Sequence, residues 1–215
     1  MKKYNTVLFD LDGTLLDTNK LILDSFHHAF DKLYKEVPSM DTLTSFFGMT
    51  LIEAFRRLAK EEKDIEILLS SFREFNLSNH DEYVKIFPGV EETIFQLKKN
   101  DYKIGVVTSK LNKTAKRGLK LFDLEKHVDV FIGADDTHIH KPDPFPVLEC
   151  LRRLGTTGES SFMVGDSPHD ITAGKLSGCK TVFVNYSMVN IDRSLLECDY
   201  RINQMTELKE ILNLE

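Results

Sequence analysis

The sequence lacks the features that define several protein classes. No apolar run approaches the ~20 residues that a membrane span needs. The apolar stretch that follows Met1 to Tyr4 ends at Asp10, so it is too short for a signal peptide. Cys150, Cys179 and Cys198 form no Cys-x-x-Cys pair and no zinc-site spacing. We therefore expect a cytoplasmic protein with reduced cysteines and no membrane partner.

The sequence also has few basic residues relative to acidic ones. Lysine and arginine number 28 against 34 aspartates and glutamates, which gives a formal net charge of −6. The short basic runs are scattered along the chain, so no basic stripe predicts binding to nucleic acid. Hydrophobic residues make up 41% of the 215 residues and charged residues 29%. These are globular values, and they exclude a disordered tail, a collagen and a coiled coil.

Several familiar catalytic motifs are absent. The chain has no Gly-x-x-x-x-Gly-Lys-Ser/Thr loop and no Gly-x-Gly-x-x-Gly turn for phosphates. It has no Gly-x-Ser-x-Gly nucleophile turn and no His-Glu-x-x-His zinc helix. A calcium loop starting at Asp10 fails, because Leu15 and Leu21 stand where a glycine and an acidic ligand are required.

The hydrophobic pattern divides the chain into three parts. Val7 to Phe9 form a short apolar run that predicts a buried strand, and residues 17–83 have helical spacing. After Pro88 helices alternate with strands, which predicts right-handed βαβ units and a parallel sheet. The predicted helices cover 89–99, 112–122, 144–154, 168–176 and 205–213, and the predicted strands 103–108, 128–132, 160–165, 180–184 and 199–202. We therefore expect an α/β fold, a doubly wound parallel sheet with residues 1–16 and 84–215 as its core domain and residues 17–83 as an inserted helical cap domain.

Four polar clusters fall at the carboxyl ends of predicted strands, where open parallel sheets bind ligands. The clusters are Asp10 to Thr14, Thr108 to Lys110, Lys141 to Pro144 and Gly165 to Asp170. Although far apart in sequence, they should converge on one edge of the sheet.

This convergence would crowd the carboxylates of Asp10, Asp12, Asp166 and Asp170. Two like charges 4 Å apart repel by ~1 kcal/mol in water and ~4 kcal/mol at an effective dielectric constant of 20, so the cluster needs a cation. Oxygen ligands favour a hard ion such as Mg²⁺. With the charge of Lys141 close by, the residues predict a phosphate site that contains a carboxylate nucleophile.

At these clusters the chain resembles the haloacid dehalogenase superfamily. Its motifs are Asp-x-Asp-Gly-Thr, a strand-ending Thr or Ser, a Lys often followed by Pro-x-Pro, and Gly-Asp-x-x-x-Asp, and all four occur here in order. The helical insert is similar to the small C1 cap of that superfamily. The segments Phe47 to Thr50, Gly105 to Lys110 and Lys141 to Leu148 resemble its branch of phosphoglycolate phosphatases and inorganic pyrophosphatases.

The resemblance implies a role for each motif residue. Asp10 would be the catalytic nucleophile and Asp12 the catalytic acid and base. Mg²⁺ would be held by Asp10, by the backbone carbonyl of Asp12 and by Asp166, while Asp170 would support them or bind through water. The phosphoryl oxygens would be bound by three further residues, Thr108, Ser109 (through its amide) and Lys141.

Structural interpretations of these residues remain open. Thr108 and Asp166 are in positions where helix caps are common, and Asp170 is equally compatible with a purely structural role. Lys110 and Asn112 are candidates for substrate contact, but Asn112 also suits a helix cap. The phenylalanines of the insert favour helix packing over an aromatic clamp on the substrate.

The expected activity is a Mg²⁺-dependent phosphohydrolase with an aspartyl-phosphate intermediate and a small phosphorylated substrate, either pyrophosphate or phosphoglycolate. A phosphomutase of the β-phosphoglucomutase kind shares all four clusters and is the alternative. A signalling receiver would be shorter and would lack the insert, whereas a silent phosphate-binding module would release no phosphate. We expect a monomer or weak homodimer.

Overall fold

A computed structural model describes residues 3–214, and a parallel sheet forms its centre. The strands of the sheet are β1 (Thr6–Phe9), β4 (Lys103–Val107), β5 (Val130–Ile132), β6 (Ser161–Gly165), β7 (Lys180–Val184) and β8 (Tyr200–Ile202). Their spatial order is β5-β4-β1-β6-β7-β8, and every neighbouring pair is parallel. The predicted α/β fold is therefore confirmed, and the predicted strand boundaries agree to within two residues.

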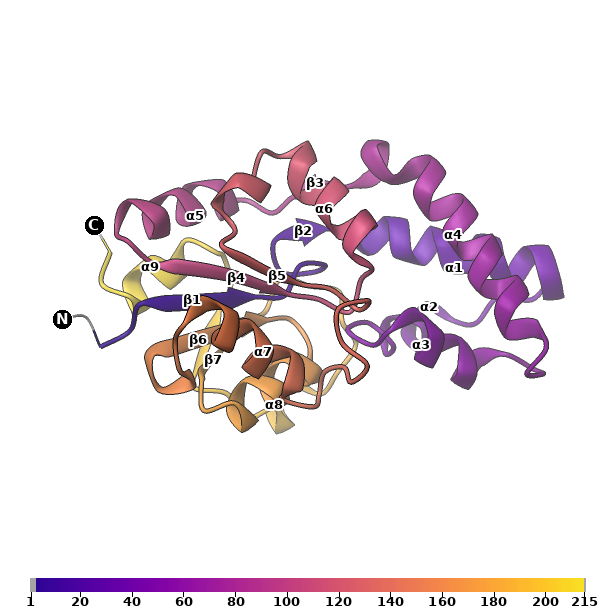
Figure 1. Cartoon of the computed structure of the whole chain (residues 1–215). Helices are drawn as coiled ribbons and strands as arrows, with labels where there is room; N and C mark the ends of the chain where they lie inside the picture. Colours follow the sequence, from indigo (N-terminus) through magenta and orange to yellow (C-terminus); the bar gives the residue numbers. More distant parts are fainter. Residues whose placement is uncertain (1–2, 215) are drawn as a thin grey trace.

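Helices cover both faces of the sheet, as Figure 1 shows. One face carries α5 (Val90–Lys99) and α6 (Asn112–Leu121), and the other carries α7 (Phe145–Leu154) and α8 (Pro168–Leu176). A terminal helix, α9 (Glu207–Ile211), packs against α5. The four residues of β1 are all fully buried, as expected for a central strand that is covered on both faces.

Residues 19–83 fold into four helices with their own apolar cluster. They are α1 (Asn19–Tyr34), α2 (Met40–Thr44), α3 (Leu51–Leu58) and α4 (Asp64–Tyr83). Phe26, Phe55 and Phe72 form a set of edge-to-face aromatic contacts at its centre. In Figure 1 these helices lie together beyond the carboxyl ends of the central strands.

The chain leaves and re-enters the sheet domain through a two-stranded antiparallel ribbon. The ribbon consists of β2 (Leu16–Asp17) and β3 (Lys85–Ile86). Two-residue strands carry no readable hydrophobic period, so the sequence pattern did not predict them. Among residues 3–214, no helix has the length and hydropathy needed to cross a membrane.

Candidate active site

The topology brings the four polar clusters together. Asp10 directly follows β1, and the neighbouring strands β4 and β6 end just before Thr108 and Asp166. Lys141 lies in the loop between β5 and α7 and reaches the same edge of the sheet. Residues separated by more than a hundred positions therefore meet because their strands are adjacent.

Lys141 is the centre of the buried charge network. Only 4% of the residue is exposed, and its Nζ donates to Asp10 Oδ1 at 2.8 Å, to Asp170 Oδ1 at 2.5 Å and to the Val107 carbonyl at 2.7 Å. Burial opposes the charge of this ammonium, yet the carboxylates of Asp10 and Asp170 raise the pKa of Lys141 above its ordinary value. Lys141 is thus a fixed positive charge, not a solvated loop lysine.

Three buried carboxylates surround this lysine. One carboxylate oxygen from each of Asp10, Asp166 and Asp170 lies within 4.8 Å of the others. Burial raises the pKa of Asp10 to about 7, against the opposing effect of Lys141. Burial, with the charges of Asp10 and Asp170, also raises the pKa of Asp166 well above its usual value. With one ammonium against three carboxylates, the ionised cluster has a net charge of −2.

Asp166 has one carboxylate oxygen that suits a metal ligand. Asp166 is 2% exposed, and its Oδ2 accepts a hydrogen bond from the Ser187 hydroxyl. Its Oδ1 is buried and has no hydrogen-bond partner in residues 3–214. A buried carboxylate oxygen without a donor is costly, and a divalent cation would both satisfy it and neutralise the cluster. The residues present therefore fit Mg²⁺.

Asp170 is occupied by structural contacts. Its Oδ2 accepts from the Ser167 amide at 3.0 Å and from the Ser167 hydroxyl at 2.6 Å, while its Oδ1 accepts from Lys141. Ser167 is the N-cap of α8, and Asp170 completes the capping box. The cap of this helix is therefore Ser167 and not Asp166, which leaves Asp166 free to face the site.

Asp12 is held by two donors. Its Oδ1 accepts from Lys110 Nζ at 2.7 Å and from the Thr18 hydroxyl at 2.7 Å. Asn112, the other residue considered for substrate contact, instead donates to the carboxylates of Asp135 and Asp136. The structure thus brings Lys110 into the site and directs Asn112 away from it.

Thr108 and Ser109 line the same cavity as the acids. Thr108 is 6% exposed, and its hydroxyl accepts from the Lys110 amide at 3.2 Å. The Ser109 hydroxyl donates to the Gly48 carbonyl at 2.9 Å, a contact with the helical insert that sequence reasoning did not foresee.

A cavity of about 450 Å³ opens over these groups. The sheet side contributes polar residues: Asp10, Asp12, Thr108, Ser109, Lys110 and Asp166. The insert contributes a mostly apolar wall: Ile22, Phe26, Phe46, Phe47, Met49, Leu51, Ile52, Phe72 and Leu77. Some phenylalanines therefore serve both helix packing and the cavity wall.

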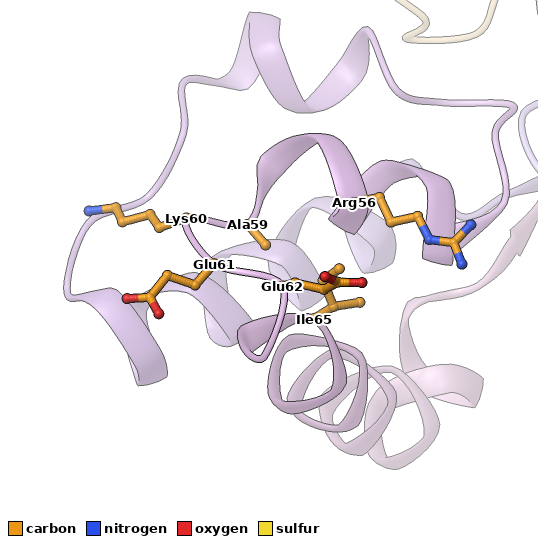
Figure 2. Close-up of a pocket in the computed structure, with 6 residues that line it drawn as sticks. All are labelled: Arg56, Ala59, Lys60, Glu61, Glu62 and Ile65. Atoms are coloured by element: carbon orange, nitrogen blue, oxygen red, sulfur yellow. The ribbon is translucent and has the colours of Figure 1, made fainter.

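A second pocket lies on the surface of the insert, between α3 and α4. It measures about 260 Å³ and is lined by Arg56, Ala59, Lys60, Glu61, Glu62 and Ile65, whose positions are drawn in Figure 2. None of the residues predicted for the site lines it. The cavity at the end of the sheet is therefore the candidate active site.

Sequence reasoning missed Thr18 and Ser187. Thr18 lies six positions after Asp12, just before α1, and Ser187 lies three positions after the end of β7. The four clusters are polar residues that lie just past a strand end. Ser187 has the same position relative to β7, and that position is the signal that points to it.

A parallel sheet with an acid cluster at its carboxyl edge, beneath a helical insert, is the architecture of a Rossmann-like hydrolase of the haloacid dehalogenase type. The family model described as haloacid dehalogenase-like hydrolase matches residues 7–184. The chain belongs to this family. The prediction that it is a phosphatase of the haloacid dehalogenase type is confirmed.

Known proteins resemble the chain over nearly its whole length. Pyrophosphatase PpaX of Bacillus cereus is 40% identical over 214 residues, covering 98% of this chain and 97% of the relative. The crystal structure of a "predicted phosphoglycolate phosphatase" from Haemophilus somnus superposes with a TM-score of 0.87 at 24% identity, covering 98% and 99% of the two chains. β-Phosphoglucomutase from Clostridium difficile superposes with a TM-score of 0.83 at 20% identity, covering 98% and 97%. The two structures establish a shared fold.

Proposed function

We propose that the protein is a Mg²⁺-dependent phosphohydrolase that acts through an aspartyl-phosphate on Asp10. The observation that carries this proposal is the buried cluster in which Lys141 bridges Asp10 and Asp170 beside the unsatisfied oxygen of Asp166. An ordinary structural ion pair would not gather three buried carboxylates around a single ammonium. A site for a divalent cation and a phosphoryl group accounts for it.

Asp10, Asp166 and the backbone carbonyl of Asp12 would hold the metal. When bound, Mg²⁺ would withdraw charge from the phosphoryl oxygens and keep Asp10 ionised, which lowers the repulsion between two anions. Thr108, the Ser109 amide and Lys141 would bind the remaining phosphoryl oxygens. The fold holds these donors before the substrate arrives, so little reorganisation would be needed in the transition state.

The reaction would proceed in two displacements. A carboxylate oxygen of Asp10 bonds to phosphorus while the bond to the leaving oxygen breaks, and Asp12 gives its proton to that oxygen. Asp12, now ionised, takes a proton from water as the water oxygen bonds to phosphorus. The bond between phosphorus and Asp10 then breaks, which releases phosphate and restores both carboxyl groups.

Pyrophosphate is the first candidate substrate. The supporting observation is the 40% identity to a pyrophosphatase over nearly the whole of both chains. Arg73, Lys110 and Lys113 line the cavity beyond the acids, and their charges could bind the second phosphate group.

The apolar wall of the cavity supports a second candidate, an organic phosphate monoester such as phosphoglycolate. Pyrophosphate has no carbon atom to contact that wall, whereas an organic ester has. Phosphomutase activity on a sugar phosphate uses the same four clusters and is the remaining alternative.

Initial rates with Mg²⁺ on pyrophosphate, phosphoglycolate, hexose 1-phosphates and nucleotides would test these candidates. We expect phosphate release from pyrophosphate with the highest kcat/KM and no release in EDTA. A preference for phosphoglycolate would support the second candidate. Conversion of a hexose 1-phosphate into its 6-phosphate would establish a mutase, and release of phosphate at equal rate in EDTA would refute the metal-dependent mechanism.

A further inference from the structure

Ser187 makes a buried contact with the cluster from outside the four motifs. It lies in the loop after β7, is 5% exposed, and donates its hydroxyl proton to Asp166 Oδ2. The Val189 amide donates to the same hydroxyl oxygen at 3.4 Å. The Ser187 oxygen thus accepts a hydrogen bond from the Val189 amide, while its own proton points to the Asp166 carboxylate.

The loop that carries Ser187 is held by Arg193. The guanidinium of Arg193 donates to the Asn185 carbonyl at 2.9 Å and to the Ser187 carbonyl at 3.0 Å. It lies 6.0 Å from the centre of the Phe183 ring. One rigid, forked group thus fixes the backbone on both sides of Tyr186, so the Ser187 hydroxyl has a fixed position relative to the sheet.

Gly13 also packs against the Asp166 carboxylate. A Cβ atom on Gly13 would lie 2.1 Å from Asp166 Oδ2 and 2.9 Å from Ser187 Oγ, so the backbone approaches as closely as it can. Between this backbone and the Ser187 hydroxyl, the carboxylate has little freedom to rotate. Its Oδ1, which has no hydrogen-bond partner among the described residues, is the oxygen left for the interior of the site.

We propose that Ser187 is a positioning residue that holds Asp166 with Oδ1 directed at the cation. This inference rests on the proposed function, because it presumes that the acid cluster binds a divalent metal. Without the hydroxyl, Oδ2 would lose its donor and the carboxylate could turn. Outer hydrogen-bond partners of metal ligands typically contribute about 10- to 100-fold to metal affinity, so we expect a loss of that size.

Metal titration of the substrate-free, full-length protein tests the proposal. Ser187→Ala is compared with Ser161→Ala, a variant that also loses one buried serine hydroxyl. Ser161 lies at the opposite end of β6 from the site, and its hydroxyl donates to the Thr157 carbonyl at 2.7 Å. Electron paramagnetic resonance of added Mn²⁺ gives the dissociation constant, and thermal melting of the metal-free protein reports stability. We expect weaker Mn²⁺ binding by about 10- to 100-fold for Ser187→Ala and wild-type affinity for Ser161→Ala.

A purely structural role for Ser187 predicts a different pattern. In that case Ser187→Ala would melt at a lower temperature but bind Mn²⁺ like the wild type, which would overturn the proposal. If Ser187→Ala does not fold, Ser187→Cys keeps the size of the side chain with a much weaker donor, and it should show the same loss of affinity. Wild-type affinity in a folded Ser187→Cys would equally overturn the proposal. Failure of the wild type to bind Mn²⁺ or Mg²⁺ would instead refute the proposed function itself.

Discussion

The ammonium of Lys141 lies 2.8 Å from a carboxylate oxygen of Asp10, although 131 positions separate the two residues. Their contact is buried, and it joins the loop after β5 to the end of the central strand β1. The contact links the stability of the protein to its proposed chemistry, because the same lysine compensates the buried acids and is the one proposed to bind the phosphoryl group.

Replacing Lys141 by methionine should therefore destabilise the metal-free protein. The carboxylates of Asp10 and Asp170 would stay buried without their cation, and breaking a buried ion pair costs about 3–5 kcal/mol. Urea unfolding at pH 8 measures the change. Lys126→Met removes an exposed pair with Asp123 and should leave the free energy of unfolding almost unchanged. Equal effects of the two substitutions would contradict the role given to Lys141.

Replacing Lys110 by methionine should lower kcat. Lys110 is one of the two donors that hold Asp12 Oδ1, and a misplaced proton donor costs up to about a hundredfold in rate. Steady-state kinetics would measure the effect, with Lys116→Met as the control because that lysine is exposed on α6, the helix that follows Lys110. An unchanged kcat in Lys110→Met would mean that Asp12 needs no such support.

Replacing Gly13 by alanine should abolish metal binding, whereas Gly155→Ala should not. Both glycines have positive φ, so each substitution carries about 1–2 kcal/mol of backbone strain. Only at Gly13 would the new Cβ collide with Asp166, since the nearest atom to a Cβ at Gly155 is 4.0 Å away. Calorimetric titration with Mg²⁺ separates the two effects. Intact binding in Gly13→Ala would argue against Asp166 as a ligand.

The affinity for Mg²⁺ should rise with pH. Burial raises the pKa of Asp10 to about 7 in the metal-free protein, so below this pH the carboxyl holds a proton that the metal must displace. Binding at pH 6 should be weaker than at pH 8 and should release protons. Calorimetric titration at pH 6 in two buffers with different ionisation enthalpies measures the number of protons released. The same affinity at both pH values, without proton release, would contradict a ligand role for Asp10.

The fold was predictable because its signals are local. The strands of the sheet other than β8 are short apolar runs, and helical segments lie between them, so the order and type of the elements followed from the sequence. The breaks within residues 41–83 were not predicted. Gly48 at positive φ and the turn before α4 divide a segment whose hydrophobic pattern reads as continuously helical.

The sequence predicted that the candidate residues lie together at one edge of the parallel sheet, but it did not predict which side chains pair there. The rule that ligand sites lie at the carboxyl ends of parallel strands placed Asp10, Thr108 and Asp166 at one edge. The rule does not say that Lys110 pairs with Asp12 while Asn112 turns away, because tertiary packing sets those side-chain directions. A serine in a loop is too common for Ser187 to be recognised without its contact to Asp166.

Trapping the covalent intermediate tests the central claim most directly. The wild-type enzyme is mixed with Mg²⁺ and substrate, quenched in acid during turnover, and mapped by peptide mass spectrometry. We expect one added phosphoryl group on the peptide that contains Asp10. A folded Asp10→Asn variant should carry none, and its rate should fall by at least about a thousandfold. A phosphoryl group on another residue, or rapid turnover by Asp10→Asn, would contradict the central claim.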